Sequence, residues 1–191
     1  MRKIRLFFAV FFLTGFLLNA QTFERLNIEF EVNNETLKDP LTGGLNSPQL
    51  NEVDLNNDQI KDLYIFDRVG NVHLPFLNEG TNQNPDYQFA PQFVRNFPND
   101  VGNFVLLRDF NQDGIMDLFG HANTQTNPTS VKAFKGKFEN NQLRFDRILF
   151  DNSDFLNYND NNTGDTRTIE ISSTDIPGFA DLDGDGDMDI L

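Results

Sequence analysis

One acidic pattern of nine residues occurs three times in this chain, and it constrains the fold more than any other feature. Each copy reads Asp-x-[Asp/Asn]-x-Asp-[Gly/Gln]-x-x-Asp and is followed at once by Leu63, Leu118 or Ile190. We call the copies the first loop (residues 54–62), the second loop (109–117) and the third loop (181–189). Recurrence of one unit indicates a fold assembled from copies of that unit.

Oxygen-bearing side chains at positions 1, 3, 5 and 9 of each loop suit a hard cation, above all calcium. Ca²⁺ takes six to eight oxygen ligands at roughly 2.3–2.6 Å and tolerates flexible geometry, whereas Mg²⁺ demands an octahedron and keeps its waters. We therefore expect side-chain ligands at those four positions and a main-chain carbonyl ligand at position 7. The expected ligands are Asp54, Asn56, Asp58, Ile60 and Asp62; Asp109, Asn111, Asp113, Ile115 and Asp117; and Asp181, Asp183, Asp185, Asp187 and Asp189.

Position 6 distinguishes the first loop from the other two. The chain must turn sharply there, often with positive φ, and glycine meets that need at Gly114 and Gly186. Gln59 occupies the same position in the first loop and would be strained. The sequence therefore predicts that calcium affinity falls from the third loop to the second and then to the first.

Other metal motifs fit these loops less well. An EF-hand needs a bidentate glutamate at position 12, where the first two loops have Ile65 and Gly120. Zinc and copper are poor candidates because the chain has no cysteine and only His73 and His121, which we expect to be surface strand residues. The alternative of ordinary solvated turns is disfavoured, because it would require the same spacing to arise three times by chance.

The first twenty residues predict a secretory signal peptide. Arg2, Lys3 and Arg5 precede an almost wholly apolar run from Leu6 to Leu18, and Ala20 offers a small residue for cleavage. The rival interpretation is a membrane anchor, but this run of 13 residues falls short of the roughly 20 that a spanning helix needs. We therefore expect an exported protein, secreted or at the cell surface, with no membrane insertion after cleavage.

Charge and cysteine content restrict the partners of the chain. Its formal net charge is -14, and removal of residues 1–20 takes away three positive charges and leaves -17. Such a chain repels nucleic acid and anionic membranes. An exported protein without cysteine cannot use disulfides for stability, so metal sites are the obvious substitute. The lack of cysteine and the asparagine-rich style suggest a bacterial protein.

The segments between the loops are predicted to form β-strands, so the expected fold class is all-β. Alternation of apolar and polar residues predicts a half-buried strand at Leu26–Val32, and further short apolar runs later in the chain also indicate strands. The later strands are expected at Leu63–Phe66, Val72–Leu77, Tyr87–Phe89, Phe104–Leu107, Leu118–Phe119, Val131–Phe134 and Leu143–Phe145. Residues 151–168 are rich in Asn and Asp and read either as a long polar loop or as local disorder.

The three loops, with Ile176–Ala180 before the last, resemble the FG-GAP and VCBS-type repeats known from integrin α chains. The run from Asp67 through Phe76–Gly80 to Tyr87–Phe89 resembles them too. The resemblance covers roughly residues 44–191 and implies β-propeller blades with calcium loops between strands. It further implies that Asp62, Asp117 and Asp189 begin the second strands of their blades. Gln59 in place of glycine and residues 121–130 depart from the family pattern.

The resemblance gives an expected domain division. We expect a signal peptide (1–20), an N-terminal strand segment (21–43), a first blade (44–98), a second blade (99–170) and the start of a third (171–191). The N-terminal segment would either close a propeller ring or form an edge strand of the first blade. Because Leu191 lies only two residues past the third loop, where a strand should be starting, we expect this chain to be the front portion of a longer protein with an incomplete ring.

The expected function is non-catalytic. The sequence contains no G-x-S-x-G, H-E-x-x-H or phosphate-loop motif, and its loop aspartates would be occupied by metal. We expect a calcium-stabilised binding, adhesion or scaffold module whose ligand is a protein or a glycan. The alternative is the propeller part of a larger polysaccharide-active enzyme, whose chemistry would lie elsewhere.

Overall fold

A computed structural model describes residues 28–40, 42–123, 129–186 and 188–191. The predicted signal peptide (1–20) therefore lies outside the described residues, as does Asp187. The chain divides into two units, residues 1–37 and 38–191. The described part is built from antiparallel β-strands and one short 3₁₀ helix, which confirms the all-β prediction. No helix among the described residues is long and apolar enough to cross a membrane.

In the first unit, a short hairpin replaces most of the strand predicted at Leu26–Val32. Strands β1 (Glu31–Val32) and β2 (Glu35–Thr36) pair antiparallel. Asn33 and Asn34, with φ of 54° and 66°, form the two-residue turn, as expected for hairpins whose turn must match the strand twist. The described side chains of this unit are exposed, so the prediction of a half-buried strand is wrong there.

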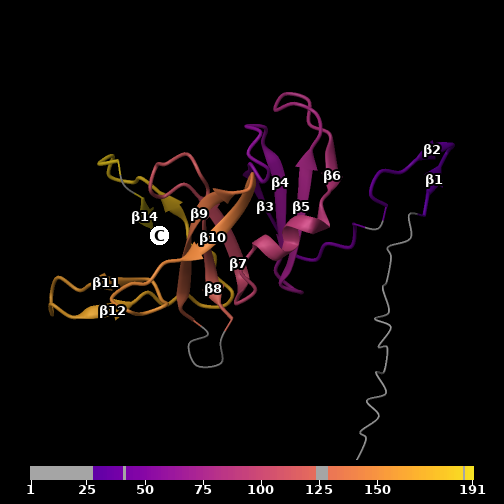
Figure 1. Ribbon diagram of the computed structural model, residues 1–191. Helices are drawn as coiled ribbons and strands as arrows, with labels where there is room; N and C mark the ends of the chain where they lie inside the picture. The colour runs from indigo at the N-terminus through magenta and orange to yellow at the C-terminus, as the bar shows by residue number, and fades with distance from the viewer. Residues whose placement is uncertain (1–27, 41, 124–128, 187) are drawn as a thin grey trace, which may run out of the picture. The chain divides into compact units, whose positions relative to one another are not determined.

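The second unit begins with a four-stranded antiparallel sheet in which sequence neighbours are spatial neighbours (Figure 1). Its strands are β3 (Pro48–Val53), β4 (Asp62–Asp67), β5 (Val72–Asn78) and β6 (Tyr87–Phe89). The first loop joins β3 to β4. A 3₁₀ helix, η1 (Pro91–Asn96), follows β6. The sequence predicted β4, β5 and β6 but neither β3 nor η1.

A second sheet repeats this plan. Its strands are β7 (Val101–Arg108), β8 (Asp117–Ala122), β9 (Val131–Glu139) and β10 (Gln142–Arg147), again in sequential antiparallel order. The second loop joins β7 to β8, as the first loop joins β3 to β4. Each sheet therefore has its acidic loop between its first and second strands.

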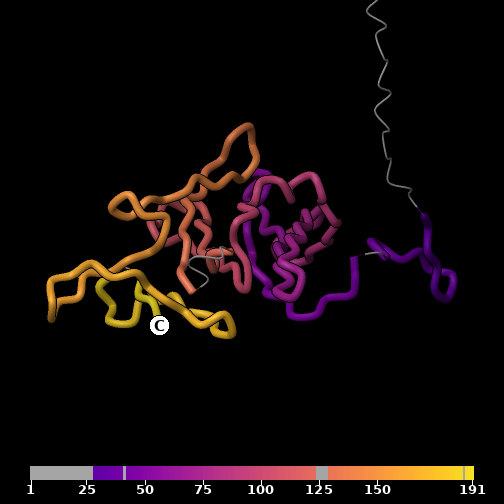
Figure 2. Tube along the Cα trace, turned by 90° about the horizontal axis from the view of Figure 1, so that it is seen from below, coloured from indigo at the N-terminus to yellow at the C-terminus, as the bar shows by residue number. Residues whose placement is uncertain are grey.

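Two hairpins follow the second sheet. Strands β11 (Asn157–Asn159) and β12 (Thr166–Thr168) pair within the segment that the sequence predicted as a polar loop or disordered. Figures 1 and 2 show this hairpin projecting away from the second sheet. The third loop joins β13 (Phe179–Ala180) to β14 (Asp189–Ile190), which pair antiparallel.

The two four-stranded sheets share one apolar core. Its buried residues include Val53, Tyr64 and Phe66 from the first sheet and residues of β7 to β10 from the second. Tyr64 stacks on Phe97, with ring centroids 4.2 Å apart. A hydrogen bond also joins the two sheets, because the main-chain N–H of Val105 donates to the side-chain Oε1 of Gln49 over 2.9 Å.

Both histidines are packed inside the protein, so their prediction as surface residues is wrong. His121 is fully buried, with Nδ1 2.9 Å from the Asn103 amide and Nε2 2.9 Å from the Ile171 carbonyl. His73 is partly buried, with Nδ1 2.7 Å from the Tyr64 hydroxyl, and burial lowers the pKa of its imidazole to about 4. Hydrogen-bond partners for the ring nitrogens make such burial tolerable.

Candidate metal centre

In each loop, the carboxylate at position 1 accepts hydrogen bonds from main-chain N–H groups of the same loop. Asp54 accepts hydrogen bonds from several main-chain N–H groups, among them those of Asn57 (2.6 Å) and Gln59 (2.9 Å). The N–H at position 6 donates to Oδ2 of position 1 in every loop. The three bonds are Gln59 to Asp54 (2.9 Å), Gly114 to Asp109 (2.9 Å) and Gly186 to Asp181 (3.2 Å). The three loops therefore share this turn from position 1 to position 6.

The carboxylate at position 9 accepts an N–H from position 2 of its own loop in all three copies, and in the first two it also accepts one from the third strand of the sheet. Oδ2 of Asp62 accepts the N–H of Leu55 at 2.7 Å, and Oδ1 accepts the N–H of Asn78 in β5, also at 2.7 Å. Asp117 repeats both bonds with Phe110 (3.2 Å) and Gly136 in β9 (2.8 Å). In the third loop, Asp189 Oδ2 accepts the N–H of Leu182 at 2.8 Å.

Asp62 and Asp117 are completely buried, which sets their electrostatics. Burial raises the pKa of the Asp62 carboxyl to about 6, against the opposing effect of the N–H donors of Asn78 and Leu55. Burial also raises the pKa of Asp117, opposed by the N–H donors of Gly136 and Phe110. A carboxylate in such a place is stabilised by nearby positive charge, which a bound cation would supply.

The backbone at position 6 has the predicted positive φ in all three loops. Gly114 (87°) and Gly186 (95°) adopt it without cost, whereas Gln59 (67°) is a side-chain-bearing residue in the left-handed region, as the sequence analysis expected. The backbone at position 4 also has positive φ, which was not predicted from the sequence. Position 4 is occupied by Asn57 (62°), Gln112 (59°) and Gly184 (78°). Asparagine and glycine at this position are the signal that could have revealed the second turn.

Three predicted ligands converge in the third loop. Carboxylate oxygens of Asp181, Asp183 and Asp189 all lie within 4.8 Å of one another. Two oxygens bound at 2.3–2.6 Å to one Ca²⁺ are separated by at most about 5 Å, so this spacing fits a single ion. Asp185 donates its N–H to Asp183 Oδ1 (3.2 Å), and the predicted carbonyl ligand Asp187 lies outside the described residues.

The first two loops bring fewer acidic groups together, because position 3 is asparagine in both. Asn56 Nδ2 donates to Asp58 Oδ2 (2.8 Å), and the Oδ1 of Asn56 is buried without a hydrogen-bond partner. In the second loop, Asn111 Oδ1 accepts the N–H of Asp113 (2.9 Å). The predicted main-chain ligands Ile60 and Ile115 donate their N–H groups to position 5, at 2.8 and 3.0 Å.

The donor set fits a hard cation in chemical terms. Every predicted side-chain ligand offers an oxygen, and a buried oxygen without a donor, as at Asn56, is one that a cation could satisfy. Each carboxylate oxygen that accepts one N–H retains a second lone pair. At such oxygens the hydrogen bond orients the carboxylate and leaves a lone pair for an ion, whereas Asp54 Oδ1 already accepts the N–H groups of Asn56, Asn57 and Asp58.

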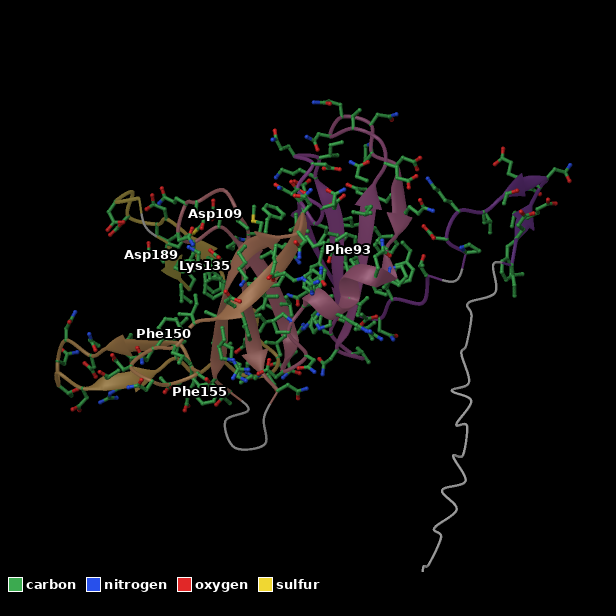
Figure 3. All side chains as sticks on the ribbon, in the orientation of Figure 1. Phe93, Asp109, Lys135, Phe150, Phe155 and Asp189 are labelled. Carbon is green, nitrogen blue, oxygen red and sulfur yellow. The ribbon has the colours of Figure 1, made fainter. Side chains whose placement is uncertain are left out.

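Two contacts of the second loop were not foreseen from the sequence. The Lys135 ammonium in β9 lies 3.1 Å from Asp113 Oδ2. Gln112 donates its side-chain amide to the carbonyl of Gly186, which places the second and third loops in contact. Figure 3 shows Asp109, Lys135 and Asp189 in this region of the second unit. Both contacts join residues far apart in the sequence, so no local pattern could indicate them.

Searches of family models, curated proteins and solved structures give no match to this chain.

Proposed function

We propose that this chain is a secreted, calcium-stabilised module of FG-GAP/VCBS-type propeller blades that serves in binding, adhesion or scaffolding. The observation that carries the proposal is the repeated hydrogen-bond pattern of the acidic loops. In each of two four-stranded sheets, the position 9 carboxylate receives one N–H from its own loop and one from the third strand. A repeated strand order with a repeated loop is what a blade architecture requires.

Calcium would act in this module by compensating charge. Asp181, Asp183 and Asp189 would hold the ion in the third loop, with the corresponding residues of the other loops doing so more weakly. A bound ion supplies positive charge where several carboxylates otherwise repel one another. The carboxylate at position 9 then transmits this stabilisation to the strands, because its remaining hydrogen bonds join the loop to the next hairpin.

Calorimetric titration of the purified, chelator-treated chain tests this proposal. Extracellular calcium modules bind with dissociation constants near 10⁻⁴–10⁻³ M, and we expect values in this range with weaker binding of Mg²⁺. The variant Asp183→Asn should weaken the tightest site toward the affinity of the second loop, because it removes one of three converging carboxylates and leaves the asparagine that the second loop has at position 3. Asp175→Asn, an exposed aspartate outside the loop, is the matched control and should bind as the unchanged chain does. Absence of calcium binding at several millimolar would refute the proposal.

A further inference from the structure

The second loop is contacted by a positively charged side chain, that of Lys135. This residue lies in β9, the third strand of its sheet, and its Nζ is 3.1 Å from Oδ2 of Asp113 at position 5. The pair is partly exposed, with 54% of the lysine side chain and 33% of the aspartate side chain accessible. The ammonium is thus directed at a carboxylate that we assign to the metal site.

The equivalent position of the first sheet has no such charge. Leu63 and Leu118 each follow position 9, and they pair with Phe76 and Phe134 respectively. Lys135 follows Phe134, so its counterpart in the first sheet is Leu77. The lysine of the first loop, Lys61, contacts Glu52 at 3.4 Å rather than a predicted ligand.

We infer that Lys135 is a tethered counter-cation that partly replaces calcium in the second loop and lowers the affinity of that loop for the ion. The inference rests on the proposed calcium function. It assigns different roles to two loops that share glycine at position 6. The third loop depends on the ion, whereas the second is held partly by the lysine. The charged group that the ammonium contacts is Asp113, whose charge, with that of Asp109, acts in turn on the buried Asp117.

The expected effect follows from the distances. An ion bound to Asp113 would lie about 5 Å from the ammonium, because a Ca–O bond of roughly 2.4 Å adds to the lysine contact. Repulsion between charges of +1 and +2 at that distance, at an effective dielectric constant of about 40–60 for a partly exposed site and reduced by physiological salt, corresponds to about a five- to tenfold loss of affinity. Removal of the lysine charge should therefore raise the calcium affinity of the second loop by that factor.

Nuclear magnetic resonance can follow the two loops separately. The amides of Gly114 and Gly186 donate to position 1 of the second and third loops, so their ¹H–¹⁵N signals report each site. In the Lys135→Gln chain, the calcium concentration at half-shift should fall five- to tenfold for Gly114 and stay unchanged for Gly186. Lys137→Gln is the matched control, because Lys137 lies on the same strand but pairs with Asp146 at 2.8 Å. Lys135→Arg keeps the charge and should behave as the unchanged chain does.

The outcomes separate this inference from the proposal beneath it. If Gly186 responds to calcium and the Gly114 midpoint is the same in the Lys135→Gln and Lys137→Gln chains, the inference is overturned while the calcium function stands. If neither glycine responds in any chain, the calcium function itself fails, and the inference with it. The dispersion of the same spectra verifies that each variant is folded.

Discussion

Backbone strain at position 6 gives the sharpest quantitative prediction from this structure. Gly114 has φ of 87°, and a Cβ added there would meet no atom within 4 Å. The cost of Gly114→Ala is therefore conformational rather than steric. A left-handed residue with a side chain costs about 1–2 kcal/mol, and the reduced freedom of the unfolded chain returns about 0.4–1 kcal/mol. The free energy of unfolding should fall by about 1 kcal/mol.

The assay is urea or thermal unfolding followed by circular dichroism in excess EGTA, so that no ion contributes. A loss of about 1 kcal/mol corresponds to a decrease in Tm of roughly 2–4 °C for a chain of this size. Gln59→Gly should have the opposite sign, since it removes strain at the same position of the first loop. Gly43→Ala is the control, because Gly43 has ordinary φ and open space around it.

The reasoning would be refuted if Gly114→Ala and Gly43→Ala changed stability equally. It would also be refuted if Gln59→Gly destabilised the protein as much as Gly114→Ala does. Either result would mean that position 6 does not hold the left-handed backbone that the turn shared by the three loops requires.

Three further predictions concern the ion and the two histidines. Chelation of calcium should lower the Tm. Calcium at about 1 mM, bound with a dissociation constant of 10⁻⁴–10⁻³ M, adds roughly 0.5–1.5 kcal/mol per site to the free energy of unfolding. A Tm that is unchanged in EGTA would count against a structural ion. The pKa of His73 is lowered to about 4, so its contribution to stability is complete above its unfolded pKa of 6.5 and is lost as the pH falls toward 4. That loss is up to about 3 kcal/mol, and a His73→Phe chain with the same acid sensitivity in pH-dependent unfolding would contradict it. His121→Leu removes two buried hydrogen bonds and should cost about 2–4 kcal/mol in urea unfolding, and a cost below about 1 kcal/mol would mean that those bonds contribute little.

Local patterns in the sequence were sufficient to predict the positions of the loops and of most strands beside them. The alternation at Val72–Leu77 and the glycine at position 6 are both local signals, and the structure has β5 and a positive φ where they indicate them. Strand β3 was missed because apolar residues do not mark its buried face: Leu50 is exposed, whereas the polar Asn51 is buried together with Val53. Its position depends on pairing with β4, which composition does not reveal.

Long-range contacts account for the other errors. His121 is buried because Ile171, fifty residues further along the chain, accepts its hydrogen bond. The hairpin β11–β12 forms from asparagine- and threonine-rich residues that lack an apolar pattern. The position 9 aspartates were foreseen as ligands, but their bonds to Asn78 and Gly136 could be seen only once the third strands were placed. Lys135 escaped notice for the same reason.

The most direct test of the whole account is a crystal structure of the chain grown in calcium chloride, with anomalous scattering used to locate the ions. We predict a calcium peak in the third loop, bound by Asp181, Asp183 and Asp189, and weaker peaks in the other two loops. Three loops without anomalous density, with their carboxylates turned into solvent, would contradict the claim that these acidic repeats hold a divalent ion.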